Sequence, residues 1–267
     1  MVLSPCVPVG FLKMNVILNQ VRKFKKSIKI QKKYKNLNIQ HNCDIVKEKG
    51  NYYIHIPVSV NIVTSSNKGS FSGVDPGLRT FATTFNGVNG VDGSSVEYVH
   101  NQKLLDKLNN KLKMLKSKRC KVLPYNFLRG KRIKKKQLNK VEKKKSDLVD
   151  SLHWSVTNDL LKRNDTIYFG DIKSHDIVNG GKNRKNNQTF NDLKFFKFKQ
   201  RLIYKATTIK NKVVKLVNES YTSQGCSSCG NLYNINSSKV YKCPICKLET
   251  DRDMNSAKNI LMKGMLQ

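Results

Sequence analysis

Alternation of apolar and polar residues marks several short stretches of the chain as half-buried β-strands. The clearest stretch is YYIHIPVSVNIV (52–63), and its Pro57 predicts a strand at a sheet edge, because proline cannot donate to a ladder. After it come a short apolar run ending in SGVDPG and two further strands, RTFATTF (79–85) and SSVEYV (94–99). Turns rich in glycine, asparagine and aspartate separate them, so we expect an antiparallel meander.

Helical spacing then replaces this alternation. Two predicted helices carry apolar stripes, the first with Leu104, Leu108, Leu112 and Leu115 and the second with Leu148, Leu152, Val156 and Leu160. A break at Pro124 and the basic segment RGKRIKKK separate the two helices. We then expect a strand at 166–171, a loop at 179–188, a helix at about 190–210, a strand at 212–219, a cysteine-rich segment and a last helix at 253–265.

The order of these elements predicts the fold class. In an RNase H-like α/β domain, an antiparallel meander precedes strands that join the sheet in parallel through helical crossovers. The chain has this order, so we predict such a domain over residues 71–267, with a cysteine-containing insert at 222–250. Residues 1–70 are expected to form a short, basic and β-rich N-terminal region.

Basic residues greatly outnumber acidic ones. Lysine and arginine total 51 against 18 aspartates and glutamates, a formal net charge of +33. The excess is concentrated in residues 22–35, 103–145 and 182–215. Such segments favour contact with nucleic-acid phosphates, and a purely solubilising role is the alternative. The candidate nucleic-acid-binding residues are Lys134, Lys135, Lys136, Lys143, Lys144, Lys145, Lys197, Lys199 and Arg201.

Aromatic residues are interleaved with the last basic segment. Their rings suit stacking on bases, but we expect at least half of them in the core; they are Phe190, Phe195, Phe196, Phe198 and Tyr204. The sequence contains no run of about 18 apolar residues, so no membrane-spanning helix is expected. We therefore expect a soluble, intracellular protein without a membrane partner.

Four of the seven cysteines form two C-x-x-C pairs, Cys226 with Cys229 and Cys243 with Cys246, thirteen residues apart. Tetrahedral zinc takes four thiolates, and this spacing is typical of a zinc ribbon. Gly230 suits the tight turn after the first pair. No coordination position stays open in such a site, so the zinc is expected to be structural. The alternative, a dithiol redox site, needs one C-x-x-C pair beside a helix start and is less favoured.

Several carboxylates fall where the predicted strands end. Asp75 ends the first strand after residue 70, Asp171 ends YFGD and Glu219 follows KLVN. Asp251 and Asp253 open the last helix, where an acid is also a favoured N-cap. In the predicted fold these positions meet at one sheet edge. Carboxylates gathered there would repel one another unless divalent metal ions lay between them, which predicts a two-metal phosphodiesterase site.

Taken together, SGVDPGLRTFAT, LHWSVTNDLL, YFGDIKS, FKQRLIYKA, NESYTSQGCSSCG, YKCPIC and DRDMNSAKNIL resemble the RuvC-like nuclease core of the transposon-encoded TnpB proteins and their relatives in eukaryotes and eukaryotic viruses, the Fanzor proteins. The resemblance extends from about Gly73 to the C-terminus. It implies a mobile-element-encoded, RNA-guided DNA endonuclease, often described as a transposase, that depends on Mg²⁺. The partners implied are DNA and a guide RNA.

The resemblance also implies site residues. The first catalytic acid corresponds to Asp75 and the last to Asp253, with Asp251 as a neighbour. The middle acid is commonly at the end of the fourth strand, where this chain has Asp171, but a subgroup including Fanzor-like proteins carries a rearranged glutamate just before TSxxC, where this chain has Glu219. We favour Glu219, so Asp75, Glu219 and Asp253 are the expected magnesium ligands and Asp171 is the alternative.

Only 74 residues precede Asp75, fewer than in relatives, so we expect either a reduced, wedge-like N-terminal region or an incomplete reading of a longer gene. Two functions stay open. The first is a magnesium-dependent DNA endonuclease, guided by RNA, which acts in the nucleus if the host is eukaryotic or viral and otherwise in the cytoplasm. The second is a degenerate protein that binds nucleic acid through basic helices and the zinc ribbon without cutting. The sequence leaves the oligomeric state undetermined.

Overall fold

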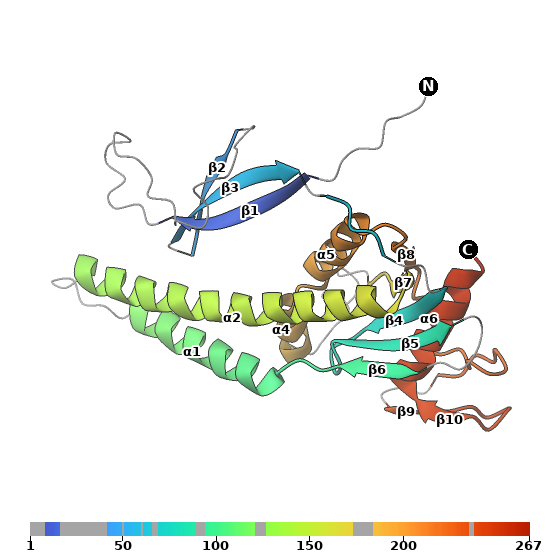
Figure 1. Ribbon diagram of the computed structural model, residues 1–267. Coiled ribbons are helices and arrows are strands. Elements are labelled where there is room, and N and C mark those ends of the chain that lie inside the picture. Colours follow the sequence, from blue (N-terminus) through green and yellow to red (C-terminus); the bar gives the residue numbers. More distant parts are fainter. Residues whose placement is uncertain are drawn as a thin grey trace. The chain divides into compact units, whose positions relative to one another are not determined.

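The computed structural model describes residues 9–16, 42–49, 51–59, 61–65, 69–88, 94–120, 127–172, 184–234 and 238–267 (Figure 1). The chain divides into two compact units that interleave along the sequence. Unit 1 comprises Met1–Asn61 with Gln102–Leu148, and unit 2 comprises Ile62–Asn101 with Val149–Gln267. The predicted domain boundary near residue 70 stays a prediction, as does the wedge-like role of residues 1–70.

Unit 1 contains a three-stranded antiparallel sheet. Its strands are β1 (Val9–Val16), β2 (Asp44–Glu48) and β3 (Asn51–Ser59), in the order β1-β3-β2. The expected edge position of Pro57 is therefore wrong, because β3 is the central strand. The pairing of β3 with β2 stops at His55, however, so Pro57 has β1 alone as its paired neighbour among the described strands.

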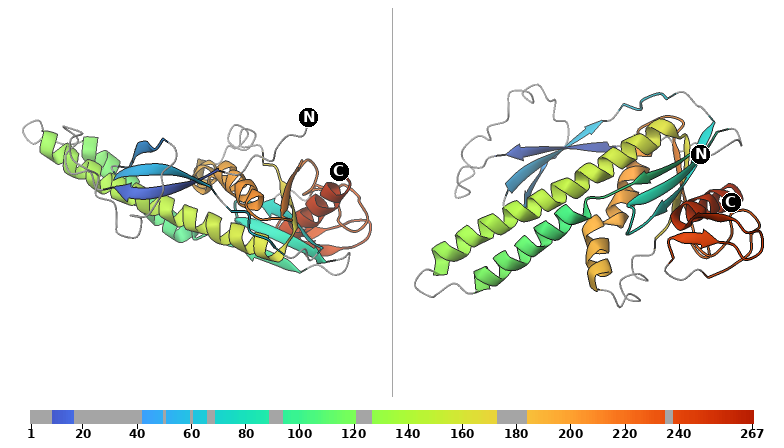
Figure 2. Two further views of the ribbon diagram at one scale, coloured as in Figure 1. Left: turned by 45° about the horizontal axis from the view of Figure 1, so that its top comes forward. Right: turned by 90° about the horizontal axis from the view of Figure 1, so that it is seen from below.

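Two helices complete unit 1 and lie side by side in both views of Figure 2. They are α1 (Gln102–Cys120) and α2 (Phe127–Arg163), and α2 continues into unit 2. The predicted leucine stripe of α1 packs as expected: Leu108, Leu112 and Leu115 are buried against Leu138 and Val141 of α2. The segment RGKRIKKK was expected between helices but lies within α2, because lysine and arginine are good helix formers.

Unit 2 is built on a five-stranded sheet of β4 (Ser70–Pro76), β5 (Ala82–Val88), β6 (Ser95–Tyr98), β7 (Thr166–Gly170) and β8 (Val213–Val217). The order is β6-β5-β4-β7-β8. The first three strands form the predicted antiparallel meander, and β7 and β8 join in parallel. The second strand begins at Ala82 instead of residue 79, because residues 77–81 form a turn closed by a hydrogen bond from the Gly77 N–H to the Phe81 carbonyl.

Helices cover both faces of this sheet, so the central strands are almost continuously buried. On one face, α6 (Arg252–Met265) packs Ile260 and Leu261 against Tyr168 of β7. On the other face, Phe169 of β7 contacts Phe198 of α5 (Phe195–Thr207). Since neighbouring strand residues point to opposite faces, β7 separates the α6 side from the α5 side.

The predicted helix at 190–210 is instead two helices, α4 (Arg184–Leu193) and α5. They are separated at Lys194, whose φ of 51° is in the left-handed region and ends the regular helix. The expected loop at 179–188 is also partly wrong, because α4 begins at Arg184; residues 173–183 lie outside the described residues.

The cysteine-rich segment lies between β8 and α6, as expected for an insert. It contains a two-stranded hairpin of β9 (Val240–Lys242) and β10 (Glu249–Asp251). In Figure 1 this hairpin and α6 are the red elements at the C-terminal end of the colour bar. A search of the described helices for a membrane span found none of sufficient length and apolarity.

Candidate functional site

The carboxylates predicted from the sequence lie where the parallel strands end. Strands β4 and β7 run in a register that places Asp75 beside Gly170. Strands β7 and β8 pair Gly170 with Val217, and Glu219 follows two residues later. Sequence positions nearly 150 residues apart are therefore brought to one edge of the sheet.

Side-chain alternation puts Asp75 and Glu219 on the face that α6 covers. Val217 packs with α6 on that face, and Glu219 is two positions further on. A Cβ atom at Gly73 would overlap the backbone oxygen of Ala257 in α6, so α6 lies directly on β4 at this point. Asp75, two positions after Gly73, shares the α6 side.

The Glu219 carboxyl group lies over the end of β7. A Cβ atom at Gly170 would overlap Oε1 of Glu219, so the glycine provides the space that this carboxyl group occupies. Oε1 of Glu219 is buried and has no hydrogen-bond partner among the described residues. A buried carboxylate oxygen without a donor is costly unless a cation or a proton meets it.

Asp253 reaches the same region from the first turn of α6. Asp251 is the N-cap of this helix, since its Oδ1 accepts hydrogen bonds from the N–H groups of Asp253 at 2.8 Å and Met254 at 3.3 Å. Asp253 instead accepts a 3.3 Å hydrogen bond from Oγ1 of the buried Thr80. Thr80 is a supporting residue that the sequence reasoning missed, because a threonine in a turn carries no signal of its own.

The electrostatics connect these three acids. Burial raises the pKa of Asp75 well above its ordinary value, and the nearby charges of Glu219 and Asp253 raise it further, whereas Arg252 lowers it. Burial also raises the pKa of Glu219 to about 7, with the charge of Asp171 as a second cause. Without a cation, burial and mutual repulsion therefore make the charged forms of these carboxylates unfavourable.

The residues present fit divalent metal ions. Carboxylate oxygens are the ligands that Mg²⁺ prefers, and the buried Oε1 of Glu219 is available to one. The three acids lie on three separate elements, β4, the residues after β8 and α6, and so form no single-loop cage. An open arrangement suits ions that keep water and substrate oxygens as ligands.

Asp171, the alternative middle acid, has a different environment. Its position next to Gly170 places it on the α5 side of β7 by strand alternation. There Nζ of Lys199, on α5, lies 2.5 Å from Oδ1 of Asp171. The charges of Glu219 and Asp253 raise the pKa of Asp75, whereas the charge of Asp171 raises the pKa of Glu219. Lys199 was predicted to bind phosphate, and its ion pair with Asp171 was not expected.

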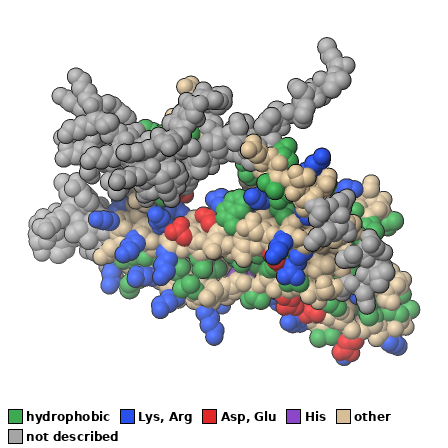
Figure 3. All heavy atoms as spheres, in the orientation of Figure 1, with side chains coloured by type: hydrophobic (Ala, Val, Ile, Leu, Met, Phe, Trp, Pro, Cys, Tyr) green, Lys and Arg blue, Asp and Glu red, His purple; other side chains and the backbone are tan. Residues whose placement is uncertain are grey.

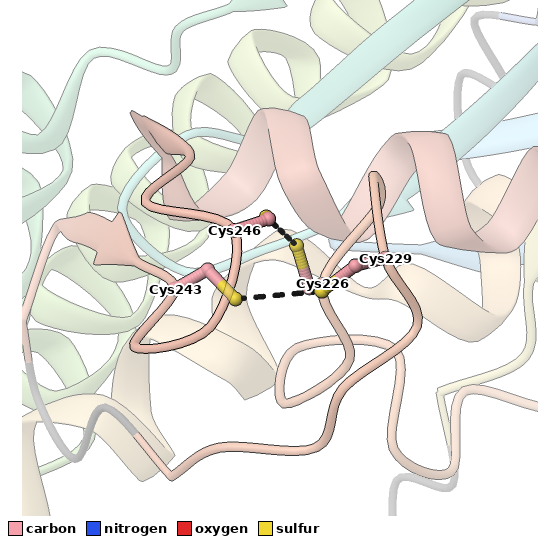
Figure 4. Close-up of side chains that lie close together, drawn as sticks. All are labelled: Cys226, Cys229, Cys243 and Cys246. Atoms are coloured by element: carbon pink, nitrogen blue, oxygen red, sulfur yellow. Dashed lines mark hydrogen bonds between the residues drawn. The ribbon is translucent and has the colours of Figure 1, made fainter.

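The four cysteines form a second candidate metal centre (Figure 4). Sγ of Cys226 lies 3.5 Å from Sγ of Cys246, and Sγ of Cys229 lies 3.6 Å from Sγ of Cys243. These separations are far from the roughly 2.05 Å of a disulfide. They are close to the roughly 3.8 Å edge of a tetrahedron with zinc–sulfur bonds of about 2.3 Å, so the cluster fits zinc.

Each C-x-x-C pair is closed by the same turn. The Gly230 N–H donates to the Cys226 carbonyl, and the Lys247 N–H donates to the Cys243 carbonyl. Both turn residues have positive φ, 75° at Gly230 and 61° at Lys247. The expectation for Gly230 is confirmed, and the second turn pays a strain cost because lysine disfavours this conformation.

Two asparagines of α6 attach the cysteine segment to the helix. Nδ2 of Asn255 donates to the Gly225 carbonyl at 2.7 Å, and its Oδ1 accepts from the Ser227 N–H at 3.0 Å. Nδ2 of Asn259 donates to the carbonyls of Thr222 and Gly225. Both asparagines belong to the DRDMNSAKNIL motif, but nothing in the sequence alone indicates this role. The helix that carries Asp253 is thus bonded directly to the ribbon.

The candidate phosphate-binding residues differ in exposure. Lys135, Lys136 and Lys144 of α2 are exposed, and Figure 3 shows Lys and Arg side chains spread over the surface of α1 and α2. Lys143 and Lys145 are partly buried, and Nζ of Lys145 donates to Oδ1 of Asn109 at 2.6 Å. The side chain of Lys134 lies outside the described residues.

Arg201 is held inside unit 2. It lies 2.7 Å from Oδ1 of Asp150 and donates to Nδ1 of the buried His153 at 3.0 Å. Lys197 approaches the same oxygen of Asp150 at 3.7 Å but remains half-exposed. Three of the five aromatic residues, Phe190, Phe195 and Phe198, are buried, as expected for at least half, whereas Phe196 and Tyr204 are exposed.

A family model and a solved structure are both similar to parts of this chain. The family model described as Cas12f1-like, TNB domain, matches residues 195–260, which include α5, β8 and the four cysteines. Among solved structures, CasPhi-2 (Cas12j) bound to crRNA superposes with a TM-score of 0.50 and 9% sequence identity, over 80% of this chain and 53% of that chain. The similarity supports a mixed α/β fold of the Cas12 and TnpB type.

Curated relatives are more specific. TnpB-like protein L79 of Acanthamoeba polyphaga mimivirus is 29% identical over 246 residues, which are 86% of this chain and 44% of the relative. The putative RNA-guided DNA endonuclease InsQ of Escherichia coli is 26% identical over 253 residues, 86% of this chain and 56% of InsQ. The resemblance to TnpB-type proteins is thereby confirmed. The chain spans about half the length of these relatives.

Proposed function

We propose that this chain is the nuclease part of a mobile-element-encoded, TnpB-type DNA endonuclease. Its catalytic domain would be RNase H-like (RuvC-type), its guide an RNA and its substrate DNA. The sheet order β6-β5-β4-β7-β8, with an antiparallel meander followed by two parallel strands, supports the RNase H-like assignment. The similarity to TnpB-like protein L79 and InsQ supports the activity.

The observation that carries the proposal is the convergence of three acids from distant parts of the sequence. Asp75 from β4, Glu219 after β8 and Asp253 from α6 interact electrostatically on the α6 side of the sheet. A structural role does not account for Glu219, because its buried Oε1 has no hydrogen-bond partner among the described residues. Groups that cost stability in this way are typical of functional sites.

In this proposal Asp75, Glu219 and Asp253 hold Mg²⁺. Bound magnesium supplies an activated water and stabilises the leaving oxygen in phosphodiester cleavage. Thr80 orients Asp253 through its hydrogen bond, and Asp251 fixes the first turn of α6 by capping it. The four cysteines hold a structural zinc, and the asparagines of α6 connect that ribbon to the acidic site.

The test is cleavage of DNA by the protein purified with its copurified RNA, with and without Mg²⁺. Asp75→Ala, Glu219→Ala and Asp253→Ala are each expected to lower the cleavage rate by several orders of magnitude while DNA binding is retained. Asp171→Ala is the matched control and is expected to reduce the rate less. Loss of cleavage in Asp171→Ala with full cleavage in Glu219→Ala would exchange the two roles.

The second candidate function is a nucleic-acid-binding protein that does not cut. The lysine-rich surface of α2 favours binding with or without catalysis. This alternative predicts that a folded, RNA-loaded wild type shows no magnesium-dependent cleavage. It also predicts that Asp75→Ala leaves every measured property except stability unchanged.

A further inference from the structure

We propose that the ion pair between Lys199 and Asp171 keeps Asp171 out of the metal site, which makes Lys199 a positioning residue that leaves Glu219 as the middle acid. This inference rests on the proposed function, because it concerns the choice between two carboxylates for the same role. It assigns to Lys199 a task other than phosphate binding.

Asp171 and Glu219 compete because they follow neighbouring parallel strands. Asp171 comes directly after β7, and its N–H donates to the Val217 carbonyl at 2.8 Å, which extends the pairing with β8. Glu219 comes two residues after Val217 and is close enough to respond to the charge of Asp171. Either carboxylate is thus near the end of β7, beside Asp75.

Lys199 holds Asp171 on the α5 side. Its side chain is 19% exposed, and its ammonium group contacts Oδ1 of Asp171 directly. The ring of Phe196, one turn earlier in α5, lies 5.6 Å from the Lys199 ammonium and adds a cation–π contact. A partly buried, oriented ammonium group neutralises Asp171 better than a free surface lysine does, since solvent screens it less.

Gly170 acts with Lys199. Because position 170 has no side chain, the Glu219 carboxyl group lies over the end of β7, on the side opposite to Lys199. The two carboxylates therefore lie on opposite sides of the end of β7, one paired with an ammonium group and the other without a described donor. A divalent cation is attracted to the carboxylate whose charge is uncompensated.

The inference has a specific consequence. Removal of the Lys199 charge leaves Asp171 without a counter-ion. Asp171 lies one residue beyond the end of β7, so its side chain can turn toward Glu219, on which its charge already acts. Lys199→Met keeps a chain of similar length for packing on Phe196 and removes only the ammonium group. Once Glu219 is also neutralised, the released Asp171 is expected to replace it as a ligand.

The experiment measures Mn²⁺ affinity of the full chain by calorimetry, with Mn²⁺ as the probe for the magnesium site. Glu219→Gln is expected to weaken binding by at least the roughly 10- to 100-fold that loss of an outer-shell partner costs, because Glu219 is itself a proposed ligand. Lys199→Met in the Glu219→Gln background is expected to raise the Mn²⁺ affinity about tenfold above that of Glu219→Gln alone. Adding Asp171→Asn to this double variant is expected to abolish the recovery.

Lys197→Met in the Glu219→Gln background is the matched control. Lys197 lies on the same helix but approaches Asp150, so its loss removes an equal charge without freeing Asp171. Recovery by Lys197→Met equal to that by Lys199→Met, or no recovery by Lys199→Met, would overturn the inference. A circular-dichroism melt of each variant checks that the fold is kept.

One further variant separates this inference from the proposed function. Asp75→Asn is expected to weaken Mn²⁺ binding whichever middle acid is used. If Asp75→Asn and Glu219→Gln both leave Mn²⁺ affinity unchanged, the proposed metal site itself is wrong. If both weaken binding while Lys199→Met restores nothing, the metal site stands and the role given to Lys199 is wrong.

Discussion

Glycine is required at position 170 and at position 73 for different steric reasons. A Cβ at Gly170 would meet the end of the Glu219 side chain, which can rotate away. A Cβ at Gly73 would meet backbone atoms of α6, which cannot move without shifting the helix. Substitution of Gly170 should therefore affect the acidic site, whereas substitution of Gly73 should affect the stability of the fold.

Gly170→Ala is expected to leave the melting temperature close to that of the wild type and to weaken Mn²⁺ binding, because Glu219 must leave its place. Gly73→Ala is expected to cost about 1–3 kcal/mol of the free energy of unfolding, as overpacking usually does. Urea denaturation and Mn²⁺ calorimetry on both variants check this. A Gly170→Ala protein with wild-type Mn²⁺ affinity would show that the position of Glu219 does not matter for metal binding.

His153 is neutral in the folded protein. Its Nε2–H donates to the Leu193 carbonyl at 2.8 Å, and its Nδ1 accepts from Arg201. Burial is the main cause that lowers the pKa of His153 to about 4. Between about pH 6.5 and about pH 4 the imidazole of the unfolded chain, with a pKa of about 6.5, is protonated while that of the folded chain stays neutral. The free energy of unfolding therefore falls as the pH drops through this interval.

The free energy of unfolding is therefore expected to fall by about 2 kcal/mol between pH 7 and pH 5 because of His153, and this contribution is complete above about pH 6.5. His153→Gln retains a donor and an acceptor but has no titrating group. The difference between wild type and variant, measured by urea unfolding at both pH values, cancels the other titrating groups. A difference that does not change with pH would contradict the lowered pKa of His153 in the folded protein.

At the scale of elements, sequence patterns predicted the strands but not the contacts between segments that are distant in sequence. The meander, the parallel strands and the leucine stripe of α1 follow from local periodicity, which sequence displays directly. The break at Lys194 and the central position of β3 depend on contacts between distant segments. A local pattern holds no information on those contacts, so these features could not be predicted.

The candidate site shows the same division. The C-x-x-C spacing predicted a cluster that the structure forms, because the ligands are close in sequence. Both acids follow strands, so the sequence favours Glu219 over Asp171 without deciding between them. Which side of β7 each one occupies depends on alternation relative to Tyr168 and Phe169, and this becomes visible only when α6 and α5 are in place.

Hydrogen bonds of Asn255 and Asn259 join the cysteine-rich segment to α6. Loss of zinc is expected to unfold the segment between β8 and α6, because a structural zinc supplies on the order of 10 kcal/mol to such a module. It would also remove the partners of Asn255 and Asn259 and loosen the first turn of α6, which carries Asp253.

Cys226→Ser is therefore expected to lose about one zinc per chain and to weaken Mn²⁺ binding at the acidic site as well. Elemental analysis and Mn²⁺ calorimetry measure the two effects. Cys43→Ser, which changes a cysteine of unit 1 outside the cluster, is the control and is expected to keep both metals. Retained zinc in Cys226→Ser would contradict the four-cysteine site.

At the scale of the whole molecule, the net charge of +33 dominates the interaction with polyanions. The charge sits mainly in segments that the fold uses as helices, and their buried faces are accounted for by leucines such as Leu108 and Leu112. Exposed lysines on the remaining faces, such as Lys135, Lys136 and Lys144, can contact phosphates without reading bases. Binding strength should thus depend on salt far more than on sequence.

The logarithm of the affinity for a non-cognate DNA duplex is expected to fall linearly with the logarithm of salt concentration, with a slope of about −0.9 for each phosphate contacted. Neutralising six lysines of α2, namely Lys134, Lys135, Lys136, Lys143, Lys144 and Lys145, is expected to make that slope shallower, because fewer counterions are released. Fluorescence anisotropy between low and moderate salt measures both slopes. Asp75→Ala is the control, since it removes a proposed metal ligand and is expected to keep the wild-type slope. An unchanged slope in the six-lysine variant would assign phosphate binding to other parts of the chain.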